Sequence, residues 1–218
     1  FGYNPYLTEK DEYSGAYLAV LESAAKIIAT GGHMKECWLT FQEYFQKLGN
    51  DADKWGSPLA AVLGAYQAQM DLGLASIGGK DSMSGSYEDL HVPPTFLSFA
   101  VSMTEGKNVI SPEFKKIGSK VLITEYKKSS SERNKRFLPE KDEILALFEW
   151  MENKISDKKV ISCATPVSGG SAEILAKMMF GNKIGLNIFD DFDVNDLFKW
   201  NYGGFVFECD DSVSEDDI

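Results

Sequence analysis

The stretch Ile77-Gly78-Gly79-Lys80-Asp81-Ser82-Met83-Ser84-Gly85 combines residue types that suit a phosphorylated ligand. Two adjacent glycines let the backbone approach a ligand closely, and Lys80 offers a compact positive charge. Asp81 can accept from a hydroxyl or hold a cation, while Ser82 and Ser84 add hydroxyl donors. The alternative is a tight turn with solvated side chains, because Gly-Gly turns are common and the spacing is not that of a P-loop. Physical chemistry alone leaves both interpretations open.

The residues before this stretch predict three helices, and those after it predict a strand. Residues 16–29 show apolar positions at helical spacing, with Ser14 as the expected N-cap. A second helix is predicted at 39–48 and a third from Ser57-Pro58 to Leu72, ended by Gly73. Residues 95–103, which follow two prolines, are rich in apolar and β-favouring residues and predict a buried strand.

Strands and helices alternate in the second half of the chain, with the boundary expected between Glu105 and Gly118. The predicted strands are 120–126, 160–163 and 184–189, and the predicted helices are 141–153 and 171–180. This alternation favours an α/β unit with right-handed crossovers. The polar segment Lys127–Pro139 is expected to be a mobile surface loop.

Composition narrows the class of protein. The net charge of −11 repels phosphate backbones, which disfavours a nucleic-acid partner. No apolar run reaches the roughly 18 to 20 residues of a membrane helix, and the first residues show no signal-peptide pattern, so we expect a cytoplasmic protein without a membrane partner. Cys37, Cys163 and Cys209 lie far apart, so they predict buried, reduced thiols rather than a zinc site or disulfides.

The motif GGKDSMSG, followed by the Pro-Pro strand, resembles the second synthetase half of phosphoribosylformylglycinamidine synthase in its large clostridial-type form. GYNP at 2–5, KIIATGG at 26–32, the segment 39–65 and VPPTFLSFAVS at 92–102 extend the resemblance over most of the chain. It implies an α+β and α/β fold like that of aminoimidazole ribonucleotide synthetase (PurM-like). Residues 1–106 would be the later part of an N-type module, and 107–218 a truncated C-type module. The chain would then be an internal piece of a longer enzyme.

The resemblance also implies a reaction in purine biosynthesis. In that family, ATP phosphorylates the formyl amide oxygen of formylglycinamide ribonucleotide, and ammonia released from glutamine in another domain displaces the phosphate. The implied partners are the first synthetase half and the glutaminase domain of the parent chain. The family's His-containing catalytic segment and Asp-rich metal segment are not present here, so we name no catalytic residue and expect the isolated chain to be inactive. The implied substrate-binding residues are Gly78, Gly79, Lys80, Asp81, Ser82 and Ser84.

The family also holds an auxiliary nucleotide site with magnesium, in which a Glu is followed four residues later by an Asn. Glu22 matches the Glu, as a metal and nucleotide ligand, but Lys26 replaces the Asn. The two could equally form an ordinary i,i+4 ion pair. Ala164 and Thr165 stand where the resemblance places a His and a metal-binding Asp. We therefore expect the magnesium-dependent site to be altered or abandoned, so that the chain need not bind ATP or Mg²⁺ by itself.

Gly169 and Gly170 open the helix predicted after this turn. Helix N-terminal N–H groups often receive an anion, which would make these glycines nucleotide-binding residues, although an ordinary strand-to-helix turn fits equally well. A second class of function also stays open, namely a structural pairing module whose auxiliary nucleotide site has decayed. Exposed strand edges would allow such a piece to form a homodimer. The aromatic residues Phe41, Phe45, Trp38 and Trp55 are expected to serve packing.

Overall fold

The computed structural model describes residues 1–125, 136, 138–189 and 192–214, and the chain forms two compact units that are considered separately. Unit 1 consists of the described residues of Phe1–Ala24, Lys35–Ser102 and Lys128–Lys141. Unit 2 consists of those of Ala25–Met34, Met103–Lys127 and Asp142–Ile218. Because the units interleave along the sequence, the division into modules at residue 106 stays a prediction. The segment Lys127–Pro139 lies largely outside the described residues.

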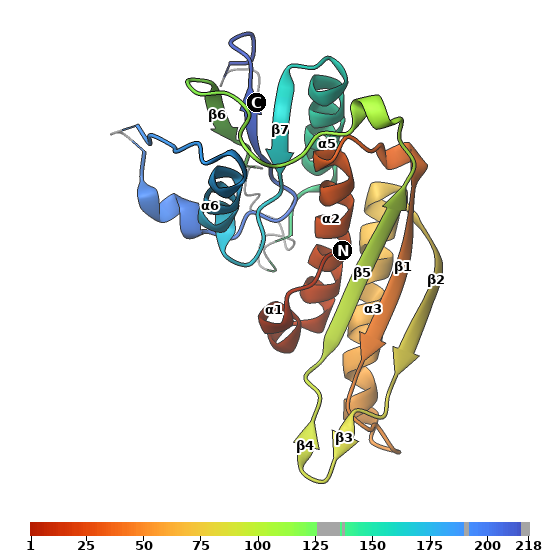
Figure 1. The fold of residues 1–218 in the computed structure, drawn as a ribbon. Coiled ribbons are helices and arrows are strands. Elements are labelled where there is room, and N and C mark those ends of the chain that lie inside the picture. The colour runs from red at the N-terminus through yellow and green to blue at the C-terminus, as the bar shows by residue number, and fades with distance from the viewer. Residues whose placement is uncertain (126–135, 137, 190–191, 215–218) are drawn as a thin grey trace. The chain divides into compact units, whose positions relative to one another are not determined.

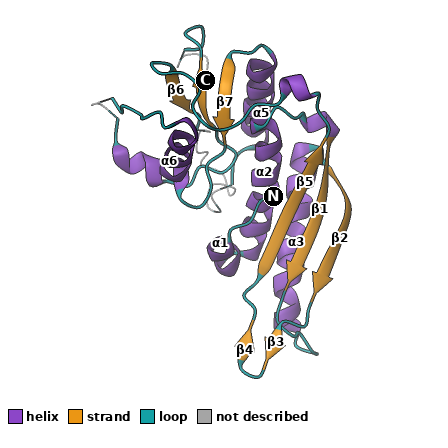
Figure 2. Ribbon diagram, viewed as in Figure 1, coloured by secondary structure: helices purple, strands orange, loops and turns teal. Residues whose placement is uncertain are grey.

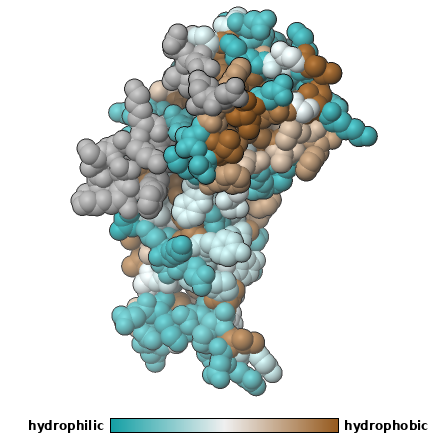
Figure 3. All heavy atoms as spheres, turned by 90° about the vertical axis from the view of Figure 1, so that its left-hand side faces the viewer, coloured by the Kyte–Doolittle hydropathy of each residue, from teal (hydrophilic) through white to brown (hydrophobic). Residues whose placement is uncertain are grey.

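Unit 1 contains a three-stranded mixed sheet in the order β2-β1-β5 (Figure 1). The central strand β1 (Cys37–Tyr44) pairs in parallel with β2 (Ala75–Ser82) and antiparallel with β5 (Thr95–Ser102). A short hairpin, β3 (Ser86–Tyr87) and β4 (Leu90–His91), lies between β2 and β5 in the chain. On the face drawn in Figure 3, the end of unit 1 that carries this hairpin is mostly hydrophilic.

The predicted helix at 39–48 is wrong, because most of this segment is strand β1. Phe41, Tyr44, Phe45 and Leu48 fit helical spacing, but Phe45 and Leu48 lie beyond the end of the strand. In the structure, Cys37, Leu39 and Glu43 are buried and Trp38 and Tyr44 are exposed, which is the two-residue period of a strand. Pairing on both sides of β1 outweighs the local pattern.

Three helices complete unit 1: α1 (Pro5–Lys10), α2 (Glu12–Ala29), which contributes residues 12–24, and α3 (Ala52–Leu72). Asn4 caps α1 by accepting from the Leu7 N–H at 3.2 Å. Helix α2 begins earlier than predicted, so Ser14 lies within its first turn and donates to Asp11 instead of capping the helix. Helix α3, which runs behind the sheet in Figure 2, also begins earlier, at the N-cap Asp51.

The core of unit 1 lies between these helices and the sheet. Gly64 allows α3 to approach α2 closely, since a Cβ there would lie 2.0 Å from the Tyr13 carbonyl oxygen. The buried Tyr17 hydroxyl donates to Asp71 at 2.9 Å and links the same two helices. The largest buried side chains of this core are Tyr17, Leu21, Leu39, Phe45 and Phe96.

Unit 2 is built on a sheet in the order β6-β8-β7, with strands β6 (Lys120–Ile123), β7 (Val160–Ala164) and β8 (Val206–Cys209). Helix α5 (Lys141–Ser156) connects β6 to β7, and α6 (Gly170–Asn182) follows β7. The strand β8 lies between β6 and β7 and runs antiparallel to both, so β6 and β7 run in the same direction although they do not pair with each other. The predicted strand at 184–189 is wrong: these residues follow α6 without regular structure. Short 3₁₀ helices occur at Met34–Glu36, Gly106–Asn108 and Val194–Phe198.

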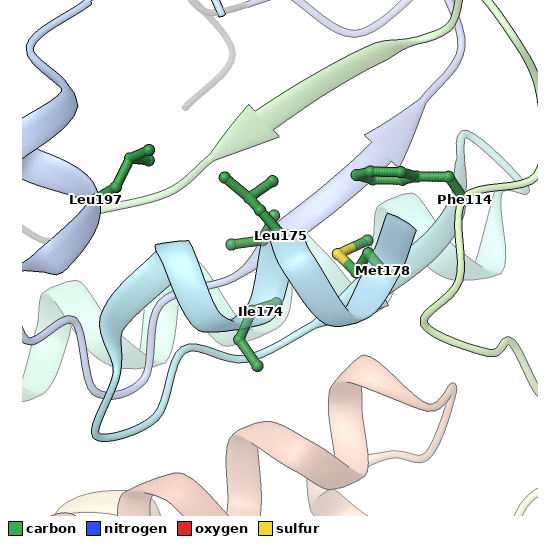
Figure 4. Packing of buried hydrophobic residues seen from close by; sticks show 6 residues of the cluster. Phe114, Ile174, Leu175, Met178 and Leu197 are labelled. Atoms are coloured by element: carbon green, nitrogen blue, oxygen red, sulfur yellow. The ribbon is translucent and has the colours of Figure 1, made fainter. Parts of the chain in front are cut away.

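The two helices of unit 2 cover opposite faces of its sheet. On the α5 side, Phe148 meets Phe205 edge-on with ring centroids 5.8 Å apart, and Trp150 meets Phe207 at 5.7 Å. Val206, whose side chain points the other way, belongs to the core on the α6 side. Figure 4 shows the buried residues of that core as sticks, which are Phe114, Ile174, Leu175, Met178, Leu197 and Val206.

Two expectations from composition can be compared with the structure. Cys37, Cys163 and Cys209 are buried and free, as predicted, and burial raises the pKa of each thiol. No helix among the described residues is long and apolar enough to cross a membrane.

Candidate functional site

The GGKDSMSG motif lies on the exposed edge strand β2 and in the turn that follows it. Gly78, Gly79, Lys80, Asp81 and Ser82 belong to β2, and all but Ser82 are exposed. Ser84 lies beyond the end of the strand. The Lys80 ammonium donates to the Asp81 carbonyl oxygen at 3.0 Å, which folds its side chain back along the strand. The Gly78–Ser82 part of the motif is therefore extended and not a tight turn, while Met83–Gly85 lie beyond the end of the strand.

Pairing with β1 divides the motif between the two faces of the sheet. Lys80 pairs with Gln42, whereas Asp81 pairs with Glu43. Successive side chains of a strand point to opposite faces, so Lys80 and Ser82 point away from α3, and Asp81 points toward it. The six predicted substrate-binding residues thus adjoin in sequence, but they do not share one face.

A cavity of about 440 Å³ lies between α3 and the strands β1 and β2, within unit 1. This volume falls in the range of sites for small organic molecules. Its walls are mainly apolar, with an acidic pair where the two strands meet. The lining residues are Phe41, Glu43, Trp55, Pro58, Leu59, Val62, Gly79, Lys80, Asp81 and Met83.

Glu43 is the residue of this cavity that the sequence interpretation missed. Its side chain is only 9% exposed. Burial, and then the neighbouring negative charge of Asp81, raise the pKa of Glu43 to about 7. The sequence does place a carboxylate at 43 within the alternating series Leu39, Phe41, Glu43 and Phe45. This strand pattern was overlooked because residues 39–48 were interpreted as a helix.

Glu22 has a structural contact in unit 1. Its side chain is 3% exposed, and its carboxylate accepts from the Tyr3 backbone N–H at 3.2 Å. Gly2 packs against the same helix, since a Cβ there would lie 2.0 Å from the Ala19 carbonyl oxygen. Glu22 therefore anchors the GYNP segment on α2, and its role as a nucleotide or metal ligand stays a prediction.

The other three predicted nucleotide-binding residues belong to unit 2. The Gly169 N–H donates to the Glu173 carboxylate at 3.1 Å, and the Gly170 N–H donates to the Val167 carbonyl at 2.8 Å. A hydrogen bond from Lys177 is the main cause of the lowered pKa of Glu173, and the charge of Lys26 also contributes. The N–H groups expected to receive an anion thus already donate within the chain. Glu173 was not anticipated, although its i,i+4 spacing from Lys177 was visible.

The position at which the resemblance expects a metal-binding Asp is structural here. Thr165 is buried, and its hydroxyl donates to the Gly204 carbonyl oxygen at 3.0 Å. Among the described residues, no group of three or more His, Cys, Asp and Glu side chains could hold a metal ion. Thr165 therefore offers no carboxylate ligand at this position, and the loss of the auxiliary magnesium site stays a prediction.

Comparison with solved structures identifies the fold. Thermotoga maritima PurL complexed with ATP superposes with a TM-score of 0.69 at 11% identity, over 97% of this chain and 35% of that one. The fold is PurM-like. The T. maritima PurL complexed with FGAR gives a TM-score of 0.66 at 12% identity, over 97% of this chain and 37% of that one. The hydrogenase maturation protein HypE in complex with ATP gives a TM-score of 0.61 at 15% identity, over 93% of this chain and 64% of that one.

The PurM-like chain spans about a third of the length of the PurL structures that it matches. A scan of protein-family models and a search of curated proteins give no match. At these identities the structural likeness establishes the fold alone, and it confirms the predicted mixture of α+β and α/β modules.

Proposed function

We propose that this chain is part of a phosphoribosylformylglycinamidine synthase and that it contributes substrate-binding residues to an ATP- and glutamine-dependent ligase of purine biosynthesis. The observation that carries the proposal is the placement of GGKDSMSG along the exposed strand β2 of a PurM-like fold. A structure of PurL with FGAR has this fold, although the identity is low. The first synthetase half and the glutaminase domain would be supplied by the rest of the parent chain.

The geometry of β2 suggests a division of labour within the motif. Lys80, on the face that points away from α3, would bind the phosphate of the ribonucleotide, and Ser82 on the same face would add a hydroxyl donor. Gly78, which precedes them on β2 and pairs with Thr40 of β1, keeps the backbone open to a ligand. ATP would act as a second substrate that activates the formyl amide oxygen, while these residues hold and orient the ribonucleotide.

The test uses the full-length parent enzyme carrying Lys80→Ala or Ser82→Ala. We expect purine auxotrophy in complementation and a raised KM for the ribonucleotide, with the folded state unchanged by circular dichroism. Lys47→Ala is the matched control, because Lys47 is exposed in the same unit but outside the motif. Near-normal kinetics for Lys80→Ala would refute the substrate-binding role.

A second candidate function is a structural pairing module whose auxiliary nucleotide site has decayed. The buried bond from Thr165 to Gly204 and the internal bond from Gly169 to Glu173 favour it. Both functions can hold in one chain, because substrate and auxiliary nucleotide would use different residues. In this view Lys26 offsets the charge of Glu173 instead of contacting a phosphate.

Titration of the chain with ATP, with and without magnesium, separates a decayed nucleotide site from a working one. We expect no magnesium-dependent binding, and Glu22→Gln should leave the titration unchanged. Tight magnesium-dependent binding that Glu22→Gln abolishes would refute decay. Sedimentation of the same sample measures the proposed self-association through exposed strand edges such as β2.

A further inference from the structure

The cavity between α3 and β1–β2 has polar groups at one end and apolar walls elsewhere. Glu43 and Asp81, paired on neighbouring parallel strands, supply the carboxylates. Trp55, Leu59 and Val62 of α3 form the opposite wall. The Trp55 indole N–H donates to the Gly49 carbonyl at 3.1 Å, which fixes the ring although 54% of the side chain is exposed. The site is thus built from strands and a helix with a held aromatic wall.

The Glu43 carboxylate is the unusual group in this cavity. The residue is 9% exposed, and no hydrogen bond or ion pair joins its carboxylate to another described residue. Its oxygens are not fully buried, so a group in the cavity can reach them. Partial burial and the second carboxylate beside it both disfavour the charged form of Glu43. The arrangement is explained if a positively charged group from outside the chain completes it.

The walls indicate which kind of cation would fit. A hydrated metal ion prefers oxygen ligands on several sides, but Phe41, Leu59 and Val62 offer none. An organic ammonium ion can place its charge at the carboxylates and its apolar part against these side chains. The faces of Phe41 and Trp55 can also attract a cation. The net charge of −11 adds a general attraction for cations.

We propose that this cavity binds a small organic ammonium ion, with its charged group at Glu43 and Asp81 and its apolar body against Trp55 and Leu59. Nothing in this inference depends on the proposed ligase function. Glu43 and Asp81 lie on the α3 face of the sheet, whereas strand alternation directs the Lys80 and Ser82 side chains to the other face, although Lys80 also borders the cavity. Glu43→Gln therefore tests the ammonium site without changing Lys80 or Ser82.

Binding should strengthen as the pH rises through neutrality. Burial, and next the charge of Asp81, raise the pKa of Glu43 to about 7, so Glu43 is largely neutral at pH 6 and ionised at pH 8. From β5, the residue paired with Glu43 is the apolar Phe96. Among the described residues, those of α3 that line the cavity are all apolar, and Lys80 is the one cationic lining residue. A bound ammonium ion would lower the pKa of Glu43 toward its ordinary value.

The probe is 2-phenylethylammonium, and its neutral counterpart of the same shape is 2-phenylethanol. Both are titrated into the chain by calorimetry and followed by two-dimensional amide NMR. At pH 8 we expect the ammonium ion to bind about tenfold or more tightly than the alcohol, as loss of one charge-assisted contact would give. The amide shifts should fall on β1, β2 and the first turns of α3.

Glu43→Gln, which keeps the side-chain size, should remove the preference for the ammonium ion, while Trp55→Ala should weaken both probes. Glu88→Gln, in the exposed β3–β4 turn, is the matched control and should change nothing. Asp81→Asn is a second variant in case Glu43→Gln perturbs folding, and circular dichroism checks each protein. Equal affinity for the alcohol, no binding at millimolar concentration, an unchanged preference in Glu43→Gln, or displacement of the probe by Mg²⁺ alone would each overturn the proposal.

Discussion

Replacing Glu208 by alanine should strongly destabilise unit 2. Glu208 lies on the central strand β8 and is fully buried, with 0% exposure. Its carboxylate accepts from the backbone N–H groups of Lys115 at 2.7 Å and Lys116 at 2.9 Å. It also accepts from the hydroxyls of Ser162, at 3.1 Å, and Ser119. One buried carboxylate thus holds the segment before β6 against two other strands.

The expected loss of unfolding free energy follows from these four hydrogen bonds. Hydrogen bonds to charged groups contribute about 1.5–3 kcal/mol each, but they are not additive. Lys115 and Lys116 lie on an exposed segment, so their N–H groups can reach water in the variant. We therefore expect Glu208→Ala to lower the free energy of unfolding by ~4 kcal/mol, and Glu208→Gln, which keeps one acceptor oxygen, by ~2 kcal/mol.

The assay is urea denaturation followed by the fluorescence of Trp150, whose ring contacts Phe207 on β8, and of Trp200, which also belongs to unit 2. Trp38 and Trp55 of unit 1 are replaced by phenylalanine in every protein compared, so that the signal reports unit 2. Glu149→Gln, an exposed change on the same helix as Trp150, is the control and should cost less than ~0.5 kcal/mol. A loss below ~1 kcal/mol for Glu208→Ala would show that the four bonds do not organise this unit.

Three further predictions concern single positions. Gly170→Ala should lower the free energy of unfolding by ~3 kcal/mol in chemical denaturation, because φ is +66° and a Cβ would lie 2.5 Å from the Leu197 carbonyl oxygen. Gly106→Ala, where a Cβ would meet open space, is the control and should be nearly neutral. Equal effects of the two changes would contradict this. The pKa of Glu43 is raised from 4.5 to about 7 in the folded protein, so between these pH values the native state binds more protons than the unfolded state. The free energy of unfolding should therefore fall by up to ~3 kcal/mol as the pH rises from 5 to 8. Glu43→Gln should flatten that profile in thermal scans, and an unchanged slope would rule out Glu43 as its source. Tyr17→Phe should lower stability by ~1 kcal/mol, because Asp71 loses a buried donor, and a neutral result would show that this bond is replaced by water.

Much of the fold was predictable where one pattern dominates locally. The helix of α5, the strands β5, β6 and β7, and the stop of α3 at Gly73 were all predicted near their observed positions. Strand β1 was not, because its aromatic residues satisfy helical spacing over a few turns. Only pairing with residues 75–82 and 95–102, which lie far along the chain, makes it a strand.

The sequence identified the motif of the candidate site, but it did not predict how the side chains of the motif are arranged. The sequence singled out Lys80 and Asp81 together, yet a strand turns adjacent side chains to opposite faces. Glu43 could not be assigned while its segment was taken for a helix, and its burial depends on α3. Glu173 likewise becomes relevant only once Gly169 is seen to donate to it.

The position of β8 between β6 and β7 bears on how the protein emerges from the ribosome. Its residues Val206–Cys209 are the last of the three strands to be synthesised, yet both of the others pair with it. Until they appear, β6 and β7 have no partner in their own sheet, and unpaired edges invite association between nascent chains. The sheet of unit 2 therefore cannot form until residues 206–209 have been synthesised, whereas the three strands of the unit 1 sheet are all present once Ser102 has been added.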